Sequence, residues 1–261
     1  MLRNPPCVVT AQTDRSGWIH GSEALCRGIA PGPRHQPCRL LLLGAPGAGK
    51  DSLAESLQDV LGICALTMAD IFHAARSYPA EWHSPALRSA LELAEKGANV
   101  PGELMLELIR ERGGCVRCRG GFLLEGFPRT VAEAEGLDEL MRAQRVTLDA
   151  VIDLVVQVQT VIDRLGTQRT CPICRAVYHP GTRPPRRPGW CNLCHAALIQ
   201  RDEARPEAIR ARLEAYATDS APLLDYYRRH GRLVAVPADG TAEETLSHTL
   251  NALSHRAEPP T

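Results

Sequence analysis

The sequence predicts an α/β domain, a doubly wound parallel sheet with helices on both faces, and a small inserted lobe. Four consecutive leucines, Leu40–Leu43, lead into a glycine-rich loop and then into an amphipathic run. Further short apolar runs alternate with helical patterns along the chain, as βαβ units require. Residues 170–200 interrupt this alternation with two closely spaced cysteine pairs, which indicates an inserted lobe.

The predicted elements follow one another in chain order from the leucine run. Leu40–Leu43 is short and entirely apolar, as a strand buried on both faces is. Apolar residues then recur at helical spacing from Leu53 to Leu61. The same two patterns predict further helices over Pro85–Lys96 and Gly102–Arg112, and further buried strands over Gly121–Leu124, Ala150–Val156 and Leu233–Val236.

The two ends of the chain differ in regularity. Residues 1–38 show no sustained period and are interrupted by Pro and Gly, so we expect an irregular extension. Near the other end, Pro206 suits the first position of the helix that begins "PEAIRARLEAY". Thr241 and Glu244 have the spacing of a capping box before a final helix.

The charge balance gives no reason to expect nucleic acid or a membrane as a partner. Lys and Arg number 30, as do Asp and Glu, and no apolar run approaches the ~20 residues of a membrane span. The N-terminus lacks the apolar segment of a secretory signal. We therefore expect a cytoplasmic protein, in which the 10 cysteines are reduced and are considered first as metal ligands.

The loop after the leucine run is a phosphate-binding motif. It matches G-x-x-x-x-G-K between a predicted strand and a predicted helix. Its glycines let backbone N–H groups approach phosphate oxygens, the helix N-terminus adds a favourable partial charge, and the lysine supplies a cation. The segment expected to contact phosphate is Gly44, Ala45, Pro46, Gly47, Ala48, Gly49, Lys50, Asp51 and Ser52.

Asp51 places an acid directly after the lysine, where phosphate oxygens would gather. A carboxylate at a helix N-terminus is favourable by roughly 0.3 to 1 kcal/mol. Beside a triphosphate it is repulsive, unless it turns outward or helps to bind Mg²⁺. Three interpretations stay open: an outward-facing side chain, a metal-assisting one, and one that weakens ATP binding.

Two C-x-x-C pairs predict a metal site in the inserted lobe. Cys171 with Cys174, and Cys191 with Cys194, have the spacing of a tetrahedral Cys₄ zinc site. Four protein ligands leave no open coordination position. We therefore predict structural Zn²⁺ that holds the lobe together.

Two further segments carry a resemblance to a known family. Together with the loop, "GFLLEGFPRT" (residues 121–130) and "QRDEARPEAIRARLEAY" (residues 200–216) closely resemble adenylate kinases, in the bacterial form whose lid carries zinc. The resemblance extends over residues 39–256. It implies a P-loop NTPase fold, a monomer, and reversible phosphoryl transfer from MgATP to a nucleoside monophosphate, with AMP as the expected acceptor.

The resemblance also implies a division into domains. The expected parts are an irregular extension (1–38), a core (39–66, 101–166 and 205–256), a nucleoside-monophosphate-binding lobe (67–100), a zinc-binding lid (167–204) and a tail (257–261).

On the donor side, the resemblance assigns roles to several polar residues. Lys50 would bind the donor phosphates, and Arg164 would lie by the donor adenine. Gln168 stands at a lid-hinge position of the ATP site. Glu125 takes the place of an aspartate that helps to hold Mg²⁺ through water, with the same charge on a longer side chain.

On the acceptor side, Arg129 would hold the acceptor phosphate, while Arg201 and Arg212 would neutralise the transferring group. The expected catalytic residues are therefore Lys50, Arg129, Arg201 and Arg212. The residues expected to bind the nucleoside monophosphate are Met68, His73, Val100, Gly126, Arg129, Glu133, Arg201 and Arg212.

Several positions depart from the family's pattern. Met68 and His73 replace a threonine and an arginine, and Gln168 replaces an arginine of the lid hinge. Glu133 replaces a glutamine that contacts the acceptor base. A carboxylate accepts hydrogen bonds but cannot donate one, and guanine offers donors at both N1 and N2, so this change favours GMP unless neighbouring groups compensate.

The sequence therefore supports adenylate kinase activity as the first hypothesis. The alternatives are a nucleoside monophosphate kinase with a shifted acceptor, GMP in particular, and a nucleotide-binding protein with little or no turnover. Mg²⁺ bound with ATP and structural Zn²⁺ are the expected metals.

Overall fold

This computed structural model describes residues 38–67, 71, 72, 75, 79, 81, 83–112, 121–174, 176–179, 184–200 and 204–257. Three of the residues named above as substrate-binding, Met68, His73 and Arg201, lie outside the described residues. The same holds for nearly all of the predicted N-terminal extension.

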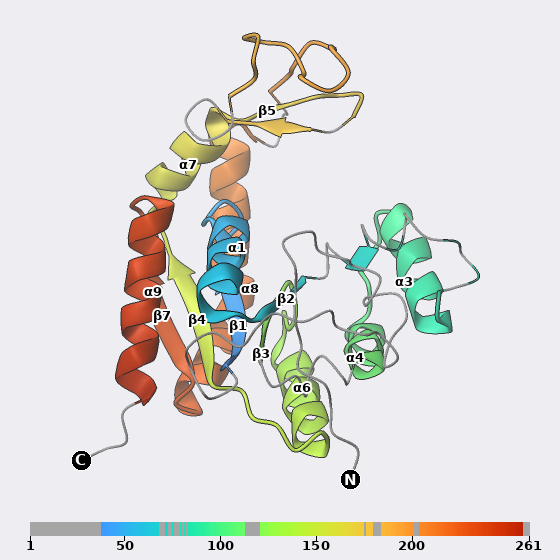
Figure 1. Ribbon diagram of the computed structural model, residues 1–261, viewed down its shortest axis with the longest axis vertical. Helices are drawn as coiled ribbons and strands as arrows, with labels where there is room; N and C mark the ends of the chain where they lie inside the picture. The colour runs from blue at the N-terminus through green and yellow to red at the C-terminus, as the bar shows by residue number, and fades with distance from the viewer. Residues whose placement is uncertain are drawn as a thin grey trace.

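The described chain is built on a five-stranded sheet in which all neighbouring strands are parallel. The order is β2-β3-β1-β4-β7, with β1 in the middle (Figure 1). The strands are β1 (Cys38–Gly44), β2 (Cys64–Thr67), β3 (Gly121–Glu125), β4 (Ala150–Val155) and β7 (Leu233–Pro237). The predicted doubly wound α/β fold is confirmed.

The leucines of β1 are divided between two cores because successive side chains of a strand point to opposite faces. Leu41 and Leu43 belong to one hydrophobic cluster, and Leu40 and Leu42 to the other. All four are buried. This two-sided burial explains why the run is wholly apolar rather than alternating.

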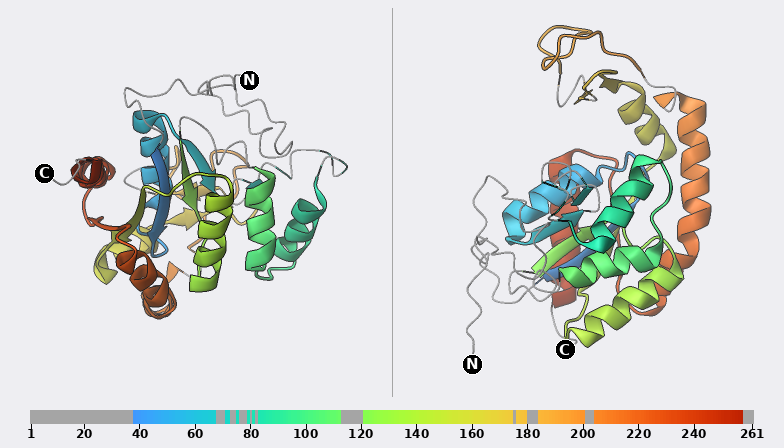
Figure 2. Two further views of the ribbon diagram at one scale, coloured as in Figure 1. Left: turned by 90° about the horizontal axis from the view of Figure 1, so that it is seen from below. Right: turned by 90° about the vertical axis from the view of Figure 1, so that its right-hand side faces the viewer.

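Helices cover both faces of the sheet (Figure 2). One face packs on α1 (Lys50–Leu61) and α9 (Ala242–Ala257), and the other on α4 (Gly102–Glu111), α6 (Val131–Ala143) and α8 (Pro206–Arg229). Two further helices extend these layers, α3 (Pro85–Glu95) against α4 and α7 (Val158–Gly166) against α8. In Figure 1, α3 and α4 lie beside the core, away from α9.

The helix boundaries follow local signals in the sequence. Ser84 caps α3 by accepting a hydrogen bond from the N–H of Leu87, and Pro85 occupies the first helical position. The capping box of α9 is confirmed: the N–H of Thr241 donates to Glu244 Oε2 at 2.8 Å, and the N–H of Glu244 donates to Thr241 Oγ1 at 3.2 Å. The sequence analysis did not predict β2, α6 or α7.

Residues 169–200 form a separate small lobe. Its two-stranded antiparallel sheet joins β5 (Arg169–Thr170) and β6 (Val177–Tyr178), and isolated bridges pair Thr170 with Ile199 and Trp190 with Ala197. The lobe extends from the end of the core at which α7 ends and α8 begins (Figure 1). We call residues 169–200 the lid.

In the part of the chain that the structure describes, no helix is both long and apolar enough to cross a membrane.

A core substitution in β1 tests this packing. Leu41 is fully buried, so Leu41→Ala should lower the free energy of unfolding by about 3 kcal/mol, through lost apolar contact and the cavity left behind. Urea denaturation measures it. Val60, 46% exposed on α1, is the control, and Val60→Ala should change stability by less than about 0.5 kcal/mol. Equal losses in the two variants would contradict the assigned burial.

Candidate active site and metal cluster

The phosphate-binding motif forms the loop between β1 and α1. The backbone at Gly49, the N-cap of α1, is left-handed with φ of 96°, a conformation that glycine adopts without strain. The side chain of Lys50 folds back over the loop, and its Nζ donates to the carbonyls of Gly44 at 2.9 Å and Ala45 at 3.2 Å. The lysine cation is therefore held above the loop by carbonyl groups that a phosphate would replace.

The charges around Lys50 fit a nucleotide site. Burial lowers the pKa of the Lys50 ammonium, while the carboxylates of Glu125 and Asp51 act in the opposite direction. Glu125 is the last residue of β3 and is 8% exposed. Mg²⁺ prefers oxygen ligands and keeps several of its water molecules. A nearly buried carboxylate next to the phosphate loop can hold such a hydrated ion, so the residues present fit Mg²⁺.

The acid that follows the lysine lies in the first turn of α1. The side chain of Asp51 is exposed, as is that of Ser52. This exposure agrees with the outward-facing interpretation, in which the carboxylate interacts with the positive end of the helix dipole.

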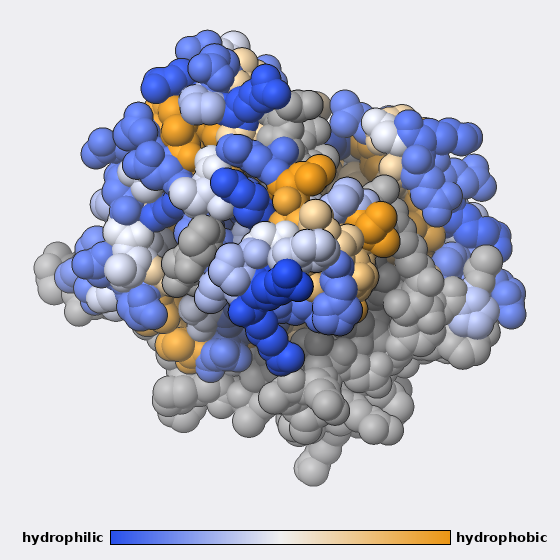
Figure 3. All heavy atoms as spheres, turned by 90° about the horizontal axis from the view of Figure 1, so that it is seen from above, coloured by the Kyte–Doolittle hydropathy of each residue, from blue (hydrophilic) through white to orange (hydrophobic). Residues whose placement is uncertain are grey.

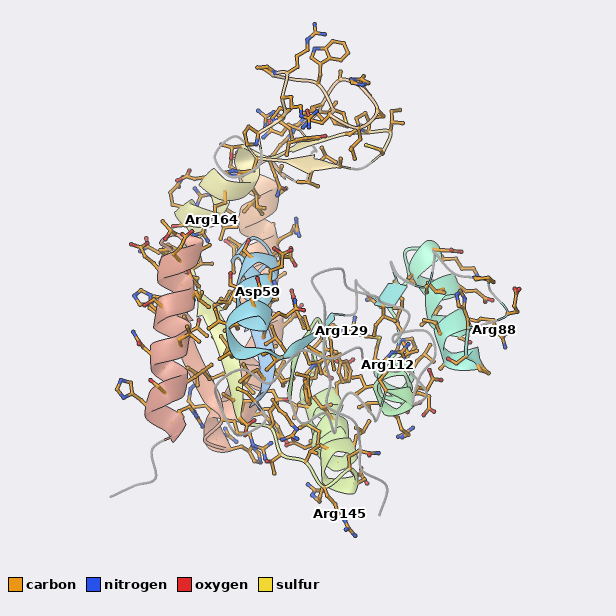
Figure 4. All side chains as sticks on the ribbon, in the orientation of Figure 1. Asp59, Arg88, Arg112, Arg129, Arg145 and Arg164 are labelled. Carbon is orange, nitrogen blue, oxygen red and sulfur yellow. The ribbon has the colours of Figure 1, made fainter. Side chains whose placement is uncertain are left out.

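Arg129, predicted to bind the acceptor phosphate, is held between two elements. Its Nη2 donates to the carbonyl of Val100 at 2.8 Å and to Glu133 Oε1 at 3.3 Å. The preceding turn contains Gly126, with φ of 83°, and a cis peptide bond between Phe127 and Pro128. Figure 4 shows Arg129 between the core sheet and α4. The structure thus brings together four residues predicted to bind the acceptor: Val100, Gly126, Arg129 and Glu133.

Glu133 makes contacts that the sequence analysis did not predict. Its Oε2 accepts the backbone N–H of Arg129 at 2.6 Å, and its own N–H donates to the hydroxyl of Thr130, the N-cap of α6. A Cβ at Gly102 would lie 2.8 Å from Glu133 Oε1, so a glycine is needed there for the carboxylate to fit. The carboxylate binds Arg129 and stabilises the start of α6.

A cavity of about 270 Å³ connects the two sides. Lys50 and Arg129 both line it, at the carboxyl ends of β1 and β3, where parallel sheets bind ligands. Its other lining residues are Leu42, Leu43, Gly44, Gly126, Phe127, Pro128, Tyr216, Asp219, Ser220 and Leu223. Two basic groups facing one cavity suit two phosphate-bearing ligands.

The sequence analysis missed the wall that α8 contributes to this cavity. Tyr216, Asp219 and Ser220 line it. Tyr216 also hydrogen-bonds with the Gly44 backbone, and burial raises the pKa of its hydroxyl. A signal was present, because Tyr216 follows Arg212 by four residues and such residues share a helix face.

Among the described residues, three further positions of the predicted site are Arg164, Gln168 and Arg212. The Nη2 of Arg164, on the last turn of α7, donates to the carbonyl of Gly240 at 2.8 Å, and Nη1 donates to Ala48 at 3.5 Å. Gln168 is half-buried, and its backbone carbonyl accepts from Arg169 Nη1 at 2.9 Å. Arg212 is exposed on α8.

The four predicted metal ligands meet in the lid. The sulfur atoms of Cys171, Cys174, Cys191 and Cys194 all lie within 4.8 Å of one another. Cys171 and Cys194 are 3.2 Å apart, and Cys174 and Cys191 are 3.4 Å apart, close to the ~3.8 Å that Zn–S bonds of ~2.3 Å give between tetrahedral ligands. The set of four thiols therefore fits structural Zn²⁺.

The surroundings of the cluster orient one of its ligands. The hydroxyl of Tyr178 lies 3.3 Å from the sulfur of Cys191 and accepts the N–H of Asn192 at 2.7 Å. The N–H of Leu193 donates to the same sulfur at 3.4 Å. Such contacts fix ligand direction and stabilise a thiolate.

Comparison with known proteins agrees with this geometry. A family model described as adenylate kinase matches residues 42–232. An adenylate kinase of Acidothermus cellulolyticus is 40% identical, over 83% of this chain and 98% of its own length. Those of Carboxydothermus hydrogenoformans and Archaeoglobus fulgidus are 37% and 38% identical, over 82% and 78% of this chain and 99% and 91% of their own lengths. The chain therefore belongs to the adenylate kinase family.

Proposed function

We propose that this protein is an adenylate kinase, which transfers a phosphoryl group reversibly from MgATP to AMP and forms two ADP. The observation that carries the proposal is that Lys50, from the phosphate loop, and Arg129, from the turn after β3, line one cavity. The family assignment supports the reaction type, and the names of the relatives support AMP as the acceptor.

Positioning and positive charge carry most of the catalysis in such a reaction. Lys50 leaves the carbonyls of Gly44 and Ala45 to bind the donor phosphates, and Arg129 exchanges Glu133 for the acceptor phosphate. Arg201 and Arg212 neutralise the transferring group. When bound, Mg²⁺ neutralises charge on the donor phosphates, and the Glu125 carboxylate would hold it through water.

The lid would close over ATP and exclude water from the reaction. From Arg164 to Arg201 the sequence contains arginines but no Asp or Glu, which suits a lobe that approaches polyphosphate. Seen from above, the described surface at this end is largely hydrophilic, with small hydrophobic patches (Figure 3). Zn²⁺ at the four cysteines would hold the lobe together, since its sheet has only two short strands.

Further proposals concern the oligomeric state, location and domain boundaries of the protein. We propose that it acts as a monomer in the cytoplasm, on small-molecule substrates. The domain boundaries stated above belong to this proposal. They include an acceptor-binding lobe over 67–100 and a closing domain over 167–204, which exceeds the lid of residues 169–200 by a few residues at each end.

Lys50→Met tests the donor site. Because the variant loses the cation at the donor phosphates, kcat should fall by about 100- to 1000-fold. ADP formation from MgATP and AMP measures it. Lys96, the other lysine of the chain and exposed after α3, is the control, and Lys96→Met should retain wild-type kcat. Unchanged kcat in Lys50→Met would rule out the assigned role.

Zinc content tests the lid. Protein purified under reducing conditions should contain about one zinc ion per chain, as a Cys₄ site requires. Cys174→Ser should lose more than half of this zinc and melt at a lower temperature, since a structural metal contributes folding free energy. Atomic emission and thermal denaturation measure the two effects. Cys64→Ser, on β2, should keep its zinc; zinc-free wild-type protein would contradict the assignment.

An acceptor panel tests the role of Glu133. Because one carboxylate oxygen of Glu133 accepts the backbone N–H of Arg129, a contact that the acceptor phosphate would leave in place, Glu133 should not select guanine. AMP should then have a kcat/KM at least about tenfold above that of GMP. Steady-state assays with MgATP and each nucleoside monophosphate measure the ratio. Preference for GMP would show that Glu133 contacts the base, and Glu133→Gln should then restore preference for AMP.

A further inference from the structure

The helix that leads into the lid is capped by a distant residue. The N-cap residue of α7, Gln157, makes no side-chain capping hydrogen bond. Asp239 Oδ1 instead accepts the N–H of Gln157 at 2.8 Å and the hydroxyl of Thr160 at 2.8 Å. Asp239 follows β7 and is 82 residues beyond Gln157. A carboxylate that follows β7, the edge strand beside β4, therefore accepts one backbone N–H and one hydroxyl at the start of α7 and interacts with the positive end of the helix dipole.

The next residue holds the other end of the same helix. The carbonyl of Gly240 accepts from Arg164 Nη2 at 2.8 Å. The other amino group of Arg164 reaches the carbonyl of Ala48, in the phosphate loop, at 3.5 Å. Figure 4 shows Arg164 on α7, near the N-terminal end of α9. Asp239 and Gly240 thus contact the first and the last turn of α7, and Arg164 connects them to the loop.

The third residue of this turn fixes it to α9. Thr241 and Glu244 form the capping box of α9, and a Cβ at Gly240 would lie 2.2 Å from Glu244 Oε2. The glycine therefore leaves room for the Glu244 carboxylate in the position that caps α9. We call residues 239–241 the α7–α9 turn.

We propose that Asp239 is a positioning residue for the ATP site, which holds α7 so that the Arg164 guanidinium lies beside the phosphate loop. This inference rests on the proposed function, in which Arg164 lies by the donor adenine. Hydrogen bonds from the Gln157 backbone, and then from Thr160, lower the pKa of the Asp239 carboxyl against a small opposing effect of burial, and the Arg164 charge acts in the same direction as the hydrogen bonds. Asp239 is therefore ionised at neutral pH.

Asp239→Ala in the full chain tests the proposal. The dissociation constant for MgATP should rise by about fivefold, which is the change in affinity that corresponds to the loss of one N-cap interaction. Isothermal titration calorimetry measures it without turnover. In assays, KM for MgATP should rise by a similar factor, while kcat and KM for AMP stay within about twofold. Asp239→Asn keeps an oxygen that accepts both hydrogen bonds, so it should restore most of the affinity.

The matched control is Asp163→Ala on the same helix. Asp163 is exposed, is the neighbour of Arg164, and accepts a side-chain hydrogen bond from Gln159. The variant removes one negative charge near Arg164 without touching the α7–α9 turn. Its affinity for MgATP should equal that of the wild type. Equal effects of the two alanine variants would overturn the proposal.

A double variant separates positioning from a general loss of structure. If Asp239 acts through Arg164, Arg164→Ala with Asp239→Ala should bind MgATP no more weakly than Arg164→Ala alone. A further loss of affinity in the double variant would overturn the positioning role. Failure of the proposed function is distinct, because wild-type protein would then form no ADP from MgATP and AMP whatever the calorimetry gives.

Discussion

Two-sided burial of β1 is the constraint on which the rest of the structure depends. Its four leucines fill both cores, so the strand lies in the middle of the sheet and its carboxyl end opens directly into the phosphate loop. A one-residue shift of register would exchange the leucines between the two cores. The packing of both cores therefore fixes the register of β1 against its neighbouring strands. The loop therefore has one position relative to β3 and β4, and Lys50 faces the turn that carries Arg129.

Lys50 and Arg129, the two cations that line the cavity, both have protein partners in this structure. Loop carbonyls accept from Lys50, and Val100 and Glu133 accept from Arg129. Lys50 is half-buried and partly desolvated, so its contacts with the loop carbonyls stabilise it when no nucleotide is bound, whereas Arg129 is exposed and depends less on its partners. In the proposed reaction, phosphate oxygens of the bound nucleotides would take the place of these carbonyl and carboxylate oxygens as acceptors of the same hydrogen bonds. In this view Glu133, a departure from the family's glutamine, contributes to the charge balance of Arg129.

The α7–α9 turn fixes the helix that leads into the lid. Three consecutive residues, Asp239 to Thr241, contact α7, Arg164 and α9 in turn. The lid, by contrast, has a sheet of two short strands and is centred on its cysteines. A lobe of that size has little apolar core of its own, so a metal is the natural means of holding it together.

The sequence by itself determined the order of the main elements, the phosphate loop and the cysteine pairs, because each depends on spacing within a few residues. Leu40–Leu43, Gly44–Lys50 and the capping box of Thr241 and Glu244 are signals of that kind. The strand β2 was missed because its four residues, Cys64–Thr67, do not form the wholly apolar run of large side chains that marked the other short strands. Only the tertiary structure decided that Glu133 binds Arg129, that Tyr216 borders the cavity and that Asp239 caps α7. Some of these contacts join elements that only the packing of helices on the sheet brings together. In others, a side chain has several possible partners within reach, and the local sequence does not show which one it binds.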